Sequence, residues 1–239
     1  MTALAAVGLF LTASEPTRAD EDVCPGPAIG FDANGATFAI PKGGAGRPLR
    51  ILAIGSSSTE GIGASTPAHA YPAQLEHELT DQDGIAADVT NAGIGGELAV
   101  KTLPRLLDAL KSGWARLVIW QVGTNDAIMG VDETAFRATV EQGVAAARTA
   151  GVPLLLMGPQ FTPTCPDQAR YERFVVIVDE IGTKDHIPVL SRFAMMKRRG
   201  AKSALGLLSG DRLHMNDLGY HCLAHAIAGA IEGATGAKL

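Results

Sequence analysis

Short apolar runs alternate along this chain with longer segments in which apolar residues recur at helical spacing. Uninterrupted apolar runs bounded by glycine or polar residues are typical of strands that are buried on both faces of a sheet. Five core strands are predicted from such runs: 50–55, 86–91, 117–122, 153–157 and 187–190. Most of them are followed by a segment long enough to form a helix.

The helical segments are recognised by apolar residues three or four positions apart. The predicted helices are 67–81, 98–110, 132–150, 168–182 and 216–232. Asp132 is a suitable N-cap for the third of these, and Gly151 a suitable C-terminal stop. Pro104 is expected either to kink the second helix or to mark its true start.

Strands that alternate with helices at this spacing predict a parallel sheet with helices on both faces, an α/β fold of three layers (α/β/α). With 239 residues, the chain suits a single domain, which we place at 49–235. The preceding segment 20–48 is rich in glycine and proline and is predicted to be an extended lead-in, with room for one short strand at 36–40. The pattern alone leaves the order of the strands open.

The first residues resemble an export signal. An apolar run at 3–11 is followed by small residues around Ala19, as a signal peptidase requires, and then by acidic residues. We therefore expect a signal peptide over 1–19 and a periplasmic or secreted protein. The run is shorter than the about 20 apolar residues that cross a bilayer, so stable membrane insertion is not expected. An apolar helix of the fold or a short membrane anchor is the alternative interpretation.

Charge, cysteines and histidines bear on three expectations: a nucleic-acid partner, a disulfide and a metal site. The net charge of −5, without a basic stripe, argues against a nucleic-acid partner. In an exported protein, Cys24 and Cys165 are the expected disulfide, while Cys222 is expected to stay packed in its apolar helix. His221 and His225 lie one helical turn apart, but no carboxylate or thiolate joins them at a ligand spacing, so no metal is expected.

Three polar clusters lie beside predicted strand ends or a helix start. Serines 56–58 follow the first strand, at the sheet edge where open α/β sheets place their chemistry. A serine hydroxyl needs an imidazole to remove its proton, and the imidazole needs an orienting partner. His214 and Asp211, three positions apart, can lie on one side of a single turn and supply both. The amide of Asn125, after the third strand, can donate to an oxyanion.

These three clusters and the glycine-rich turn at 91–97, taken in their order along the chain, resemble the SGNH hydrolase superfamily of GDSL esterases and lipases. Gly55-Ser56-Ser57 aligns with its Gly-Asp-Ser block, Asn91–Glu97 with its asparagine-glycine block, Gly123–Asp126 with its third block and Asp211–His214 with its Asp-x-x-His block. The resemblance extends from residue 50 to about residue 229. One departure is that Ser56 stands where the family usually has aspartate, which leaves three adjacent serines as candidates. The register from Gly55 to Thr59 favours Ser57.

The resemblance implies a flavodoxin-like order of five parallel strands and a serine ester hydrolase that needs no cofactor. It implies Ser57 as nucleophile, His214 as base and Asp211 as the acid that orients it. The implied oxyanion hole consists of the Ser57 and Gly96 amides with the Asn125 side chain. The implied substrate is a small-molecule or carbohydrate ester that carries a small acyl group or an O-acyl group. From the residues themselves, the apolar loop 127–131 is a candidate for the acyl side and the loop 160–162 for the leaving-group side, with core packing or a helix lead-in as the alternative explanation of both.

Each motif also has a structural explanation when it stands alone. A Ser-Ser-Ser-Thr run is usually a turn or helix cap, and Asp-x-x-His is often a capping arrangement. Four motifs in the family order favour the hydrolase. An acyltransferase with the same triad remains an alternative, as does a non-catalytic module that binds carbohydrate or phosphate. Against phosphate binding, the Gly-x-x-x-x-Gly-Lys pattern is absent after the first strand, and a phosphate cradle has no need of Asp211 and His214.

Overall fold

The computed structural model describes residues 24, 31–35, 40, 46–198 and 200–235. They form a sheet of six strands in the order β1-β6-β5-β4-β2-β3. The strands are β1 (Phe31–Asp32), β2 (Leu49–Gly55), β3 (Ala87–Gly93), β4 (Leu117–Gln121), β5 (Leu154–Met157) and β6 (Val189–Leu190). The expected signal peptide, 1–19, lies outside the described residues.

Strands β2 to β6 are parallel, and their order is the flavodoxin-like one that the family resemblance implied. The expected count of five strands is wrong by one, because β1 adds to the edge of the sheet and pairs antiparallel with β6. Two residues are too few to show any periodicity, so β1 could not be predicted from the apolar pattern. Of the short strand predicted at 36–40, residues 36–39 lie outside the described residues.

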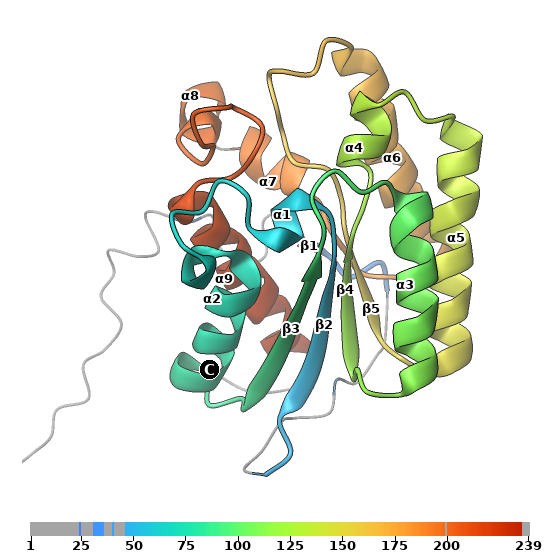
Figure 1. The fold of residues 1–239 in the computed structure, drawn as a ribbon, viewed down its shortest axis with the longest axis vertical. Coiled ribbons are helices and arrows are strands. Elements are labelled where there is room, and N and C mark those ends of the chain that lie inside the picture. Colours follow the sequence, from blue (N-terminus) through green and yellow to red (C-terminus); the bar gives the residue numbers. More distant parts are fainter. Residues whose placement is uncertain (1–23, 25–30, 36–39, 41–45, 199, 236–239) are drawn as a thin grey trace, which may run out of the picture.

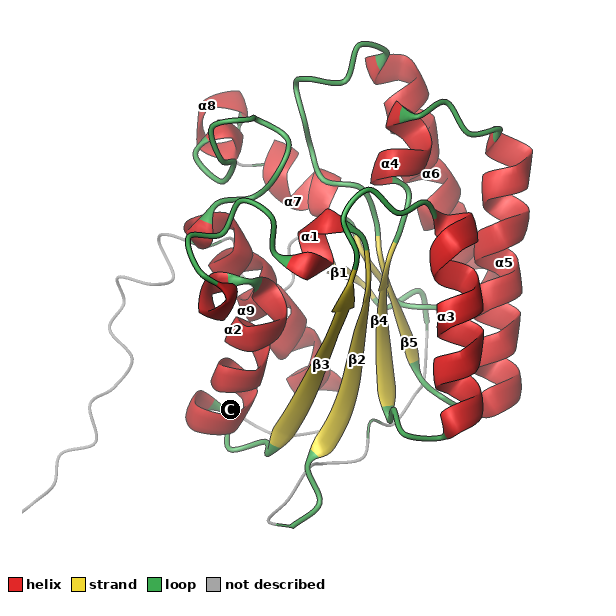
Figure 2. Cartoon of the chain, viewed as in Figure 1, coloured by secondary structure: helices red, strands yellow, loops and turns green. Residues whose placement is uncertain are grey.

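Helices cover both faces of the sheet (Figures 1 and 2). One face packs against α3 (Ala99–Ser112), α5 (Glu133–Ala150) and α6 (Gln168–Asp185), and the other against α2 (Tyr71–His77) and α9 (Asp217–Thr235). The shorter elements are α1 (Ser57–Glu60), α4 (Thr124–Ile128), α7 (Arg192–Lys197), α8 (Ala201–Leu205), the 3₁₀ helix η1 (Pro67–His69) and the π-helix η2 (Glu78–Gln82). The three-layer prediction is confirmed.

Two helices show how proline affects local structure. The single helix predicted over 67–81 is broken between η1 and α2, because Ala70 is extended and Pro72 has no N–H to continue the ladder from the preceding turn. Beyond His77 the helix continues without a break but changes to the π form in η2. In contrast, α3 continues through Pro104, which therefore does not mark its start. Helix α5 begins and ends as predicted: the Asp132 side chain accepts the Ala135 N–H, and Gly151 adopts the left-handed conformation.

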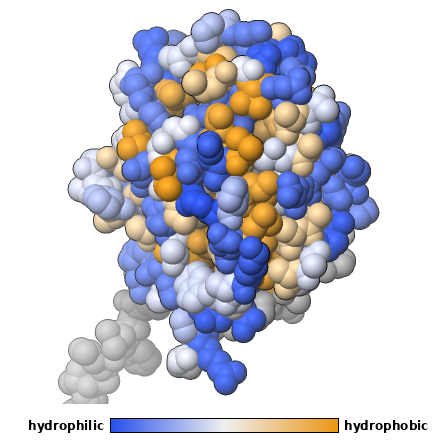
Figure 3. Space-filling model, turned by 45° about the vertical axis from the view of Figure 1, so that its right-hand side comes forward, coloured by the Kyte–Doolittle hydropathy of each residue, from blue (hydrophilic) through white to orange (hydrophobic). Residues whose placement is uncertain are grey.

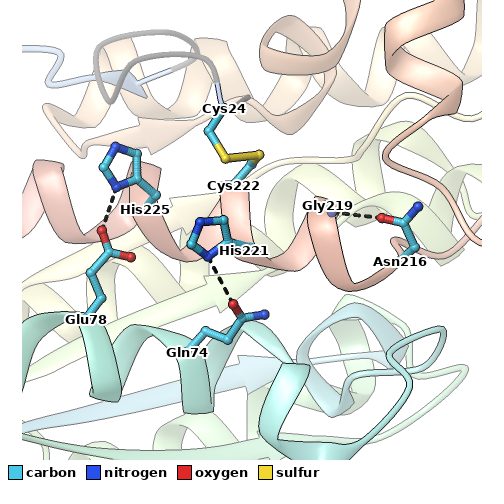
Figure 4. The surroundings of a disulfide bond; sticks show 8 residues. All are labelled: Cys24, Gln74, Glu78, Asn216, Gly219, His221, Cys222 and His225. Atoms are coloured by element: carbon cyan, nitrogen blue, oxygen red, sulfur yellow. Dashed lines mark hydrogen bonds and ion pairs between the residues drawn. A yellow bond between two sulfur atoms is a disulfide. The ribbon is translucent and has the colours of Figure 1, made fainter. Parts of the chain in front are cut away.

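The predicted disulfide between Cys24 and Cys165 is wrong. Cys24 is bonded to Cys222 of α9, with a Cα–Cα distance of 5.0 Å (Figure 4). The physical reason is the sheet itself: Cys24 and Cys222 belong to the apolar core on the α2/α9 face, whereas Cys165 is buried in the core on the opposite face. Cys165 is a free thiol that contacts the Asp167 carbonyl oxygen.

In the part of the chain that the structure describes, no helix is long and apolar enough to cross a membrane.

Candidate active site

The serine cluster lies where β2 ends and α1 begins, at the carboxyl edge of the parallel sheet. Ser56 and Ser58 are buried, with 4% and 1% of their surface exposed, and only Ser57 of the three is partly open to solvent. The Ser57 Oγ lies 2.9 Å from the Nε2 of His214. The geometry thus distinguishes among the three adjacent serines and favours the one that the register indicated.

Two glycines allow this turn to form. A Cβ on Gly55 would lie 2.7 Å from both the Cβ of Gln121 and the Oγ1 of Thr59. A Cβ on Gly93, at the end of β3, would lie only 2.0 Å from the backbone nitrogen of Glu60 in α1. Both distances are too short for any side chain, so α1 can pack onto the strand ends only because these positions are glycine.

His214 and Asp211 meet in a loop that precedes α9, and not on one side of a regular helical turn. Helix α9 begins only at Asp217, and Arg212 between the pair has a left-handed φ of +56°. The Asp211 Oδ2 is 2.6 Å from the Nδ1 of His214. The Asp211 Oδ1 accepts the backbone N–H groups of Leu213 and His214, each at 2.9 Å, and the Ser209 hydroxyl at 2.8 Å. Asp211 therefore holds the loop through Oδ1 and orients the His214 ring through Oδ2.

The hydrogen bonds also keep Asp211 ionised. Partial burial disfavours the carboxylate, but the bonds from the His214 ring, the two backbone N–H groups and the Ser209 hydroxyl outweigh it and hold the pKa of Asp211 well below its usual value. A permanently charged acceptor at this position favours the tautomer of His214 with its proton on Nδ1. That tautomer leaves Nε2 free to accept a proton from Ser57.

The other expected site residues follow the two strands beside β2. Gly96 lies in the exposed loop after β3, with a left-handed φ of +79° and open space where a Cβ would be. Asn125 lies in α4, directly after β4, and its Nδ2 donates to the Glu97 carbonyl oxygen at 2.9 Å. Since β3 and β4 both pair with β2, their carboxyl ends bring these residues to the edge that carries Ser57.

Ionic groups that are buried or half-buried hold these loops in place. The Asp126 carboxylate accepts the Ala99 N–H at 3.0 Å and the Gly123 N–H at 3.2 Å, which ties α4 to the start of α3. Burial raises the pKa of Asp126, and these backbone bonds partly offset the effect. Arg105 donates to the Ala92 carbonyl at 2.9 Å and pairs with the Glu97 carboxylate at 2.5 Å. The loop that carries Gly96 is thus held at both ends.

Two buried glutamines anchor the site in a way that the sequence did not predict. Gln121 accepts hydrogen bonds from Ser56 and Thr59, which lie on either side of Ser57. Gln160 accepts from the Thr124 hydroxyl at 2.9 Å and donates to the Leu213 carbonyl at 3.0 Å, and so links the neighbours of Asn125 and His214. The expectation that 160–162 lines the leaving-group side fails for Gln160 and Thr162, which are 1% and 0% exposed. The only signal was a polar residue inside an apolar run for Gln121, and shortly after such a run for Gln160.

The remaining histidines of α9 have local partners. The His225 Nδ1 pairs with the Glu78 carboxylate at 2.6 Å, and the His221 Nδ1 lies 3.2 Å from the Gln74 side-chain oxygen (Figure 4). Over the described residues, no group of three or more histidine, cysteine or acidic side chains is arranged to hold a metal ion.

Comparisons with known proteins agree with this architecture. The chain matches the non-GDSL lipase-like family over residues 24–237. It is 26% identical to Esterase TesA of Pseudomonas aeruginosa over 165 residues, which is 69% of this chain and 78% of that protein. A lipase/acylhydrolase from Enterococcus faecalis has the same fold, with a TM-score of 0.69 at 21% identity over 80% of this chain and 98% of that one. The SGNH-hydrolase family esterase AlinE4 gives a TM-score of 0.59 at 26% identity, over 79% and 97% of the two chains. The chain therefore belongs to the non-GDSL lipase-like family and, with it, to the SGNH-type carboxylic ester hydrolases.

Proposed function

We propose that this ester hydrolase works through a triad of Ser57, His214 and Asp211. One observation carries the proposal: the three side chains form a continuous line, with 2.6 Å from Asp211 Oδ2 to His214 Nδ1 and 2.9 Å from His214 Nε2 to Ser57 Oγ. Both distances are within hydrogen-bonding range for a proton that moves between heavy atoms.

In the proposed reaction, His214 Nε2 takes the hydroxyl proton as Ser57 Oγ attacks the acyl carbon. The imidazolium then delivers this proton to the leaving alkoxide oxygen as the ester bond breaks, which leaves an acyl group on Ser57. In the second half of the reaction, His214 Nε2 takes a proton from a water molecule as the water oxygen attacks the acyl carbon. The imidazolium then returns this proton to Ser57 Oγ as the acid is released. Asp211 accepts the Nδ1 proton's hydrogen bond throughout and stabilises the imidazolium that forms twice in the cycle.

The developing oxyanion is assigned to the backbone amides of Ser57 and Gly96 and to the Asn125 side chain. The primary amide of Asn125 has two N–H donors, and the Glu97 carbonyl uses one of them. The second N–H is left for the oxyanion. Ser57 is the first residue of α1, so its own amide has no acceptor within the helix.

We propose small acyl esters or O-acylated carbohydrates as substrates. The exposed loop around Gly96 supports access by a bulky alcohol such as a sugar, because no atom beyond the adjoining residues lies within 4 Å of where a Cβ on Gly96 would be. The loops that carry the site also expose Ile62, Ile94 and Met129, at 43%, 47% and 72%. On the face drawn in Figure 3, hydrophobic residues lie in patches between hydrophilic ones. Apolar contacts of this kind suit the acyl part of an ester.

We also propose that the protein is exported to the periplasm or secreted. The disulfide between Cys24 and Cys222 supports this location, since disulfides persist in oxidising compartments and are rare in the cytosol. Detection of the processed protein in the periplasmic or culture fraction, with residues 1–19 removed, tests the proposal. Retention of the full-length chain in the cytosol would contradict it.

The catalytic proposal is tested with nitrophenyl esters of rising acyl length and with an acetylated oligosaccharide. Ser57→Ala should lose about 10⁴-fold or more in kcat, as expected when a triad member is removed. Ser58→Ala is the matched control, because Ser58 is adjacent but buried, and it should keep a measurable activity close to that of the unaltered enzyme. Full activity of Ser57→Ala would reject the triad. Formation of a new ester between the acyl group and an added alcohol would reveal acyl transfer in place of hydrolysis.

A further inference from the structure

Three hydrogen-bond donors from the nucleophile loop converge on one oxygen atom of Gln121. Its Oε1 accepts the backbone N–H of Ser56 at 2.8 Å, the Ser56 hydroxyl at 3.1 Å and the Thr59 hydroxyl at 3.2 Å. These residues lie on both sides of Ser57. Gln121 is 3% exposed, so its side chain is shielded from bulk water. The loop around the nucleophile is therefore anchored by a buried neutral acceptor.

The position of Gln121 is set by the sheet. It is the last residue of β4, and the pairing of Ile54 with Trp120 brings Gln121 beside Gly55 at the end of β2. The contact is tight, because a Cβ on Gly55 would lie 2.7 Å from both the Cβ and the Oε1 of Gln121. A central strand is a rigid support, so an acceptor placed there holds a catalytic loop more exactly than another loop residue would.

The same contact gives a reason for serine at position 56, where the Gly-Asp-Ser block of GDSL esterases has aspartate. The Ser56 hydroxyl can donate to the Gln121 oxygen, and does so. An ionised aspartate has no proton to donate, so at this position it would oppose its own oxygens to the Gln121 oxygen. The hydroxyl of Ser56 and the carboxamide of Gln121 are chemically matched to each other.

We propose that Gln121 is a positioning residue that sets the place of the Ser57 hydroxyl, with Ser56 and Thr59 as the groups through which it acts. The inference rests on the proposed function, since it assigns a role in the reaction of Ser57. Gln121 touches neither the substrate nor the reacting atoms. Its contribution is to keep Ser57 Oγ within reach of both His214 and the acyl carbon.

The test compares variants that remove or keep the acceptor. Gln121→Leu removes it at similar volume, and kcat should fall about 100-fold with KM changed less than about threefold, because a misplacement of about 1 Å costs that much in rate. Gln121→Glu keeps an acceptor oxygen of the same reach, and its kcat should be within about tenfold of the unaltered enzyme. Ser56→Ala removes one donor of three and should lose less than Gln121→Leu. Combined with Gln121→Leu, it should cause no further loss, since the acceptor is already gone.

Thr102→Val is the matched control for a general loss of stability. Thr102 is 1% exposed, and its hydroxyl accepts the indole N–H of Trp120 at 3.1 Å. Since Trp120 precedes Gln121 in β4, this variant also removes a buried hydrogen bond to that strand. It should lower the melting temperature and leave kcat unchanged. The proposal is overturned if Gln121→Leu keeps kcat within about threefold, if Thr102→Val slows the reaction as much, or if Gln121→Glu is as slow as Gln121→Leu.

Failure of this inference is distinguishable from failure of the proposed function. If Ser57→Ala retains activity, the triad is wrong whatever the Gln121 variants do. If Ser57→Ala is inactive and Gln121→Leu is as fast as the unaltered enzyme, the triad stands and the positioning role is rejected. Reaction with a fluorophosphonate reports the same step without a substrate. Its rate should fall in Gln121→Leu in parallel with kcat.

Discussion

Replacement of Asp211 by asparagine changes one atom and should stop the reaction by reversing the tautomer of His214. The Oδ1 of Asp211 accepts from Ser209, Leu213 and His214, whereas Oδ2 accepts only from the His214 ring. An asparagine has a single oxygen, and the three donors that converge on Oδ1 will hold it there. The NH₂ group then takes the place of Oδ2 and faces the Nδ1 of His214.

The size of the effect follows from this geometry. An amide N–H that points at Nδ1 makes this nitrogen an acceptor, so the neutral ring carries its proton on Nε2 and cannot take one from Ser57. A wrong tautomer of this kind costs about 10⁴-fold in kcat, equivalent to about 5.4 kcal/mol on the activation barrier. The fold should tolerate the change, because the contacts of the Oδ1 position are kept.

The assay is kcat for hydrolysis of nitrophenyl acetate, measured beside the melting temperature. Asp211→Asn should lose the activity with little change in melting temperature. Asp211→Ala, which also removes the acceptor for the loop amides, should lose the activity and lower the melting temperature. If Asp211→Asn kept kcat within about tenfold of the unaltered enzyme, the assignment of Asp211 as the residue that orients His214 would be refuted.

Three further predictions concern the oxyanion, the disulfide and pH. Asn125→Ala should reduce kcat by about 10²- to 10³-fold with a smaller change in KM, measured on the same ester, because it removes one donor to the oxyanion; an unchanged kcat would exclude Asn125 from the hole. Cys24→Ser removes a disulfide between residues 198 positions apart and should lower the free energy of unfolding in denaturant by up to about 5 kcal/mol. In Cys165→Ser, a reductant should destabilise the protein as much as it does the unaltered enzyme. Equal stability of the unaltered enzyme with and without reductant would contradict the disulfide. Burial and the nearby Glu232 and Glu78 carboxylates raise the pKa of Asp83 to about 7. The folded protein therefore keeps a proton that the unfolded chain releases near pH 4, and stability should fall as pH rises from about 4 to about 7. Asp83→Asn should raise the melting temperature at pH 8 and not at pH 4, and the same change at both would contradict the assignment.

The layered fold could be predicted because its signals are local. Each parallel strand is a short apolar run, and the cap of α5 at Asp132 needs only its own first turn. The family motifs added the strand order and the site residues, and Ser57, Asp211 and His214 do lie in one line. These features depend on residues that are near one another in the sequence, or on motifs that are already known to meet.

The features that could not be predicted depend on packing between distant residues. Cys222 meets Cys24 because α9 packs on the side of the sheet where Cys24 lies. The apolar pattern of α9 does not show which side of the sheet the helix covers. Gln121 lies 65 positions from Ser56, and Gln160 lies 53 positions from Leu213. A polar residue near the end of a strand has the same appearance whether it faces solvent or anchors a loop.

The most direct test of the account is covalent labelling with a fluorophosphonate followed by peptide mapping. An activated serine attacks the phosphorus atom, so the label marks the hydroxyl that His214 deprotonates. We predict one adduct, on Ser57, which is lost in His214→Ala. An adduct on Ser56 or Ser58, or no adduct on a folded enzyme that hydrolyses esters, would contradict the account.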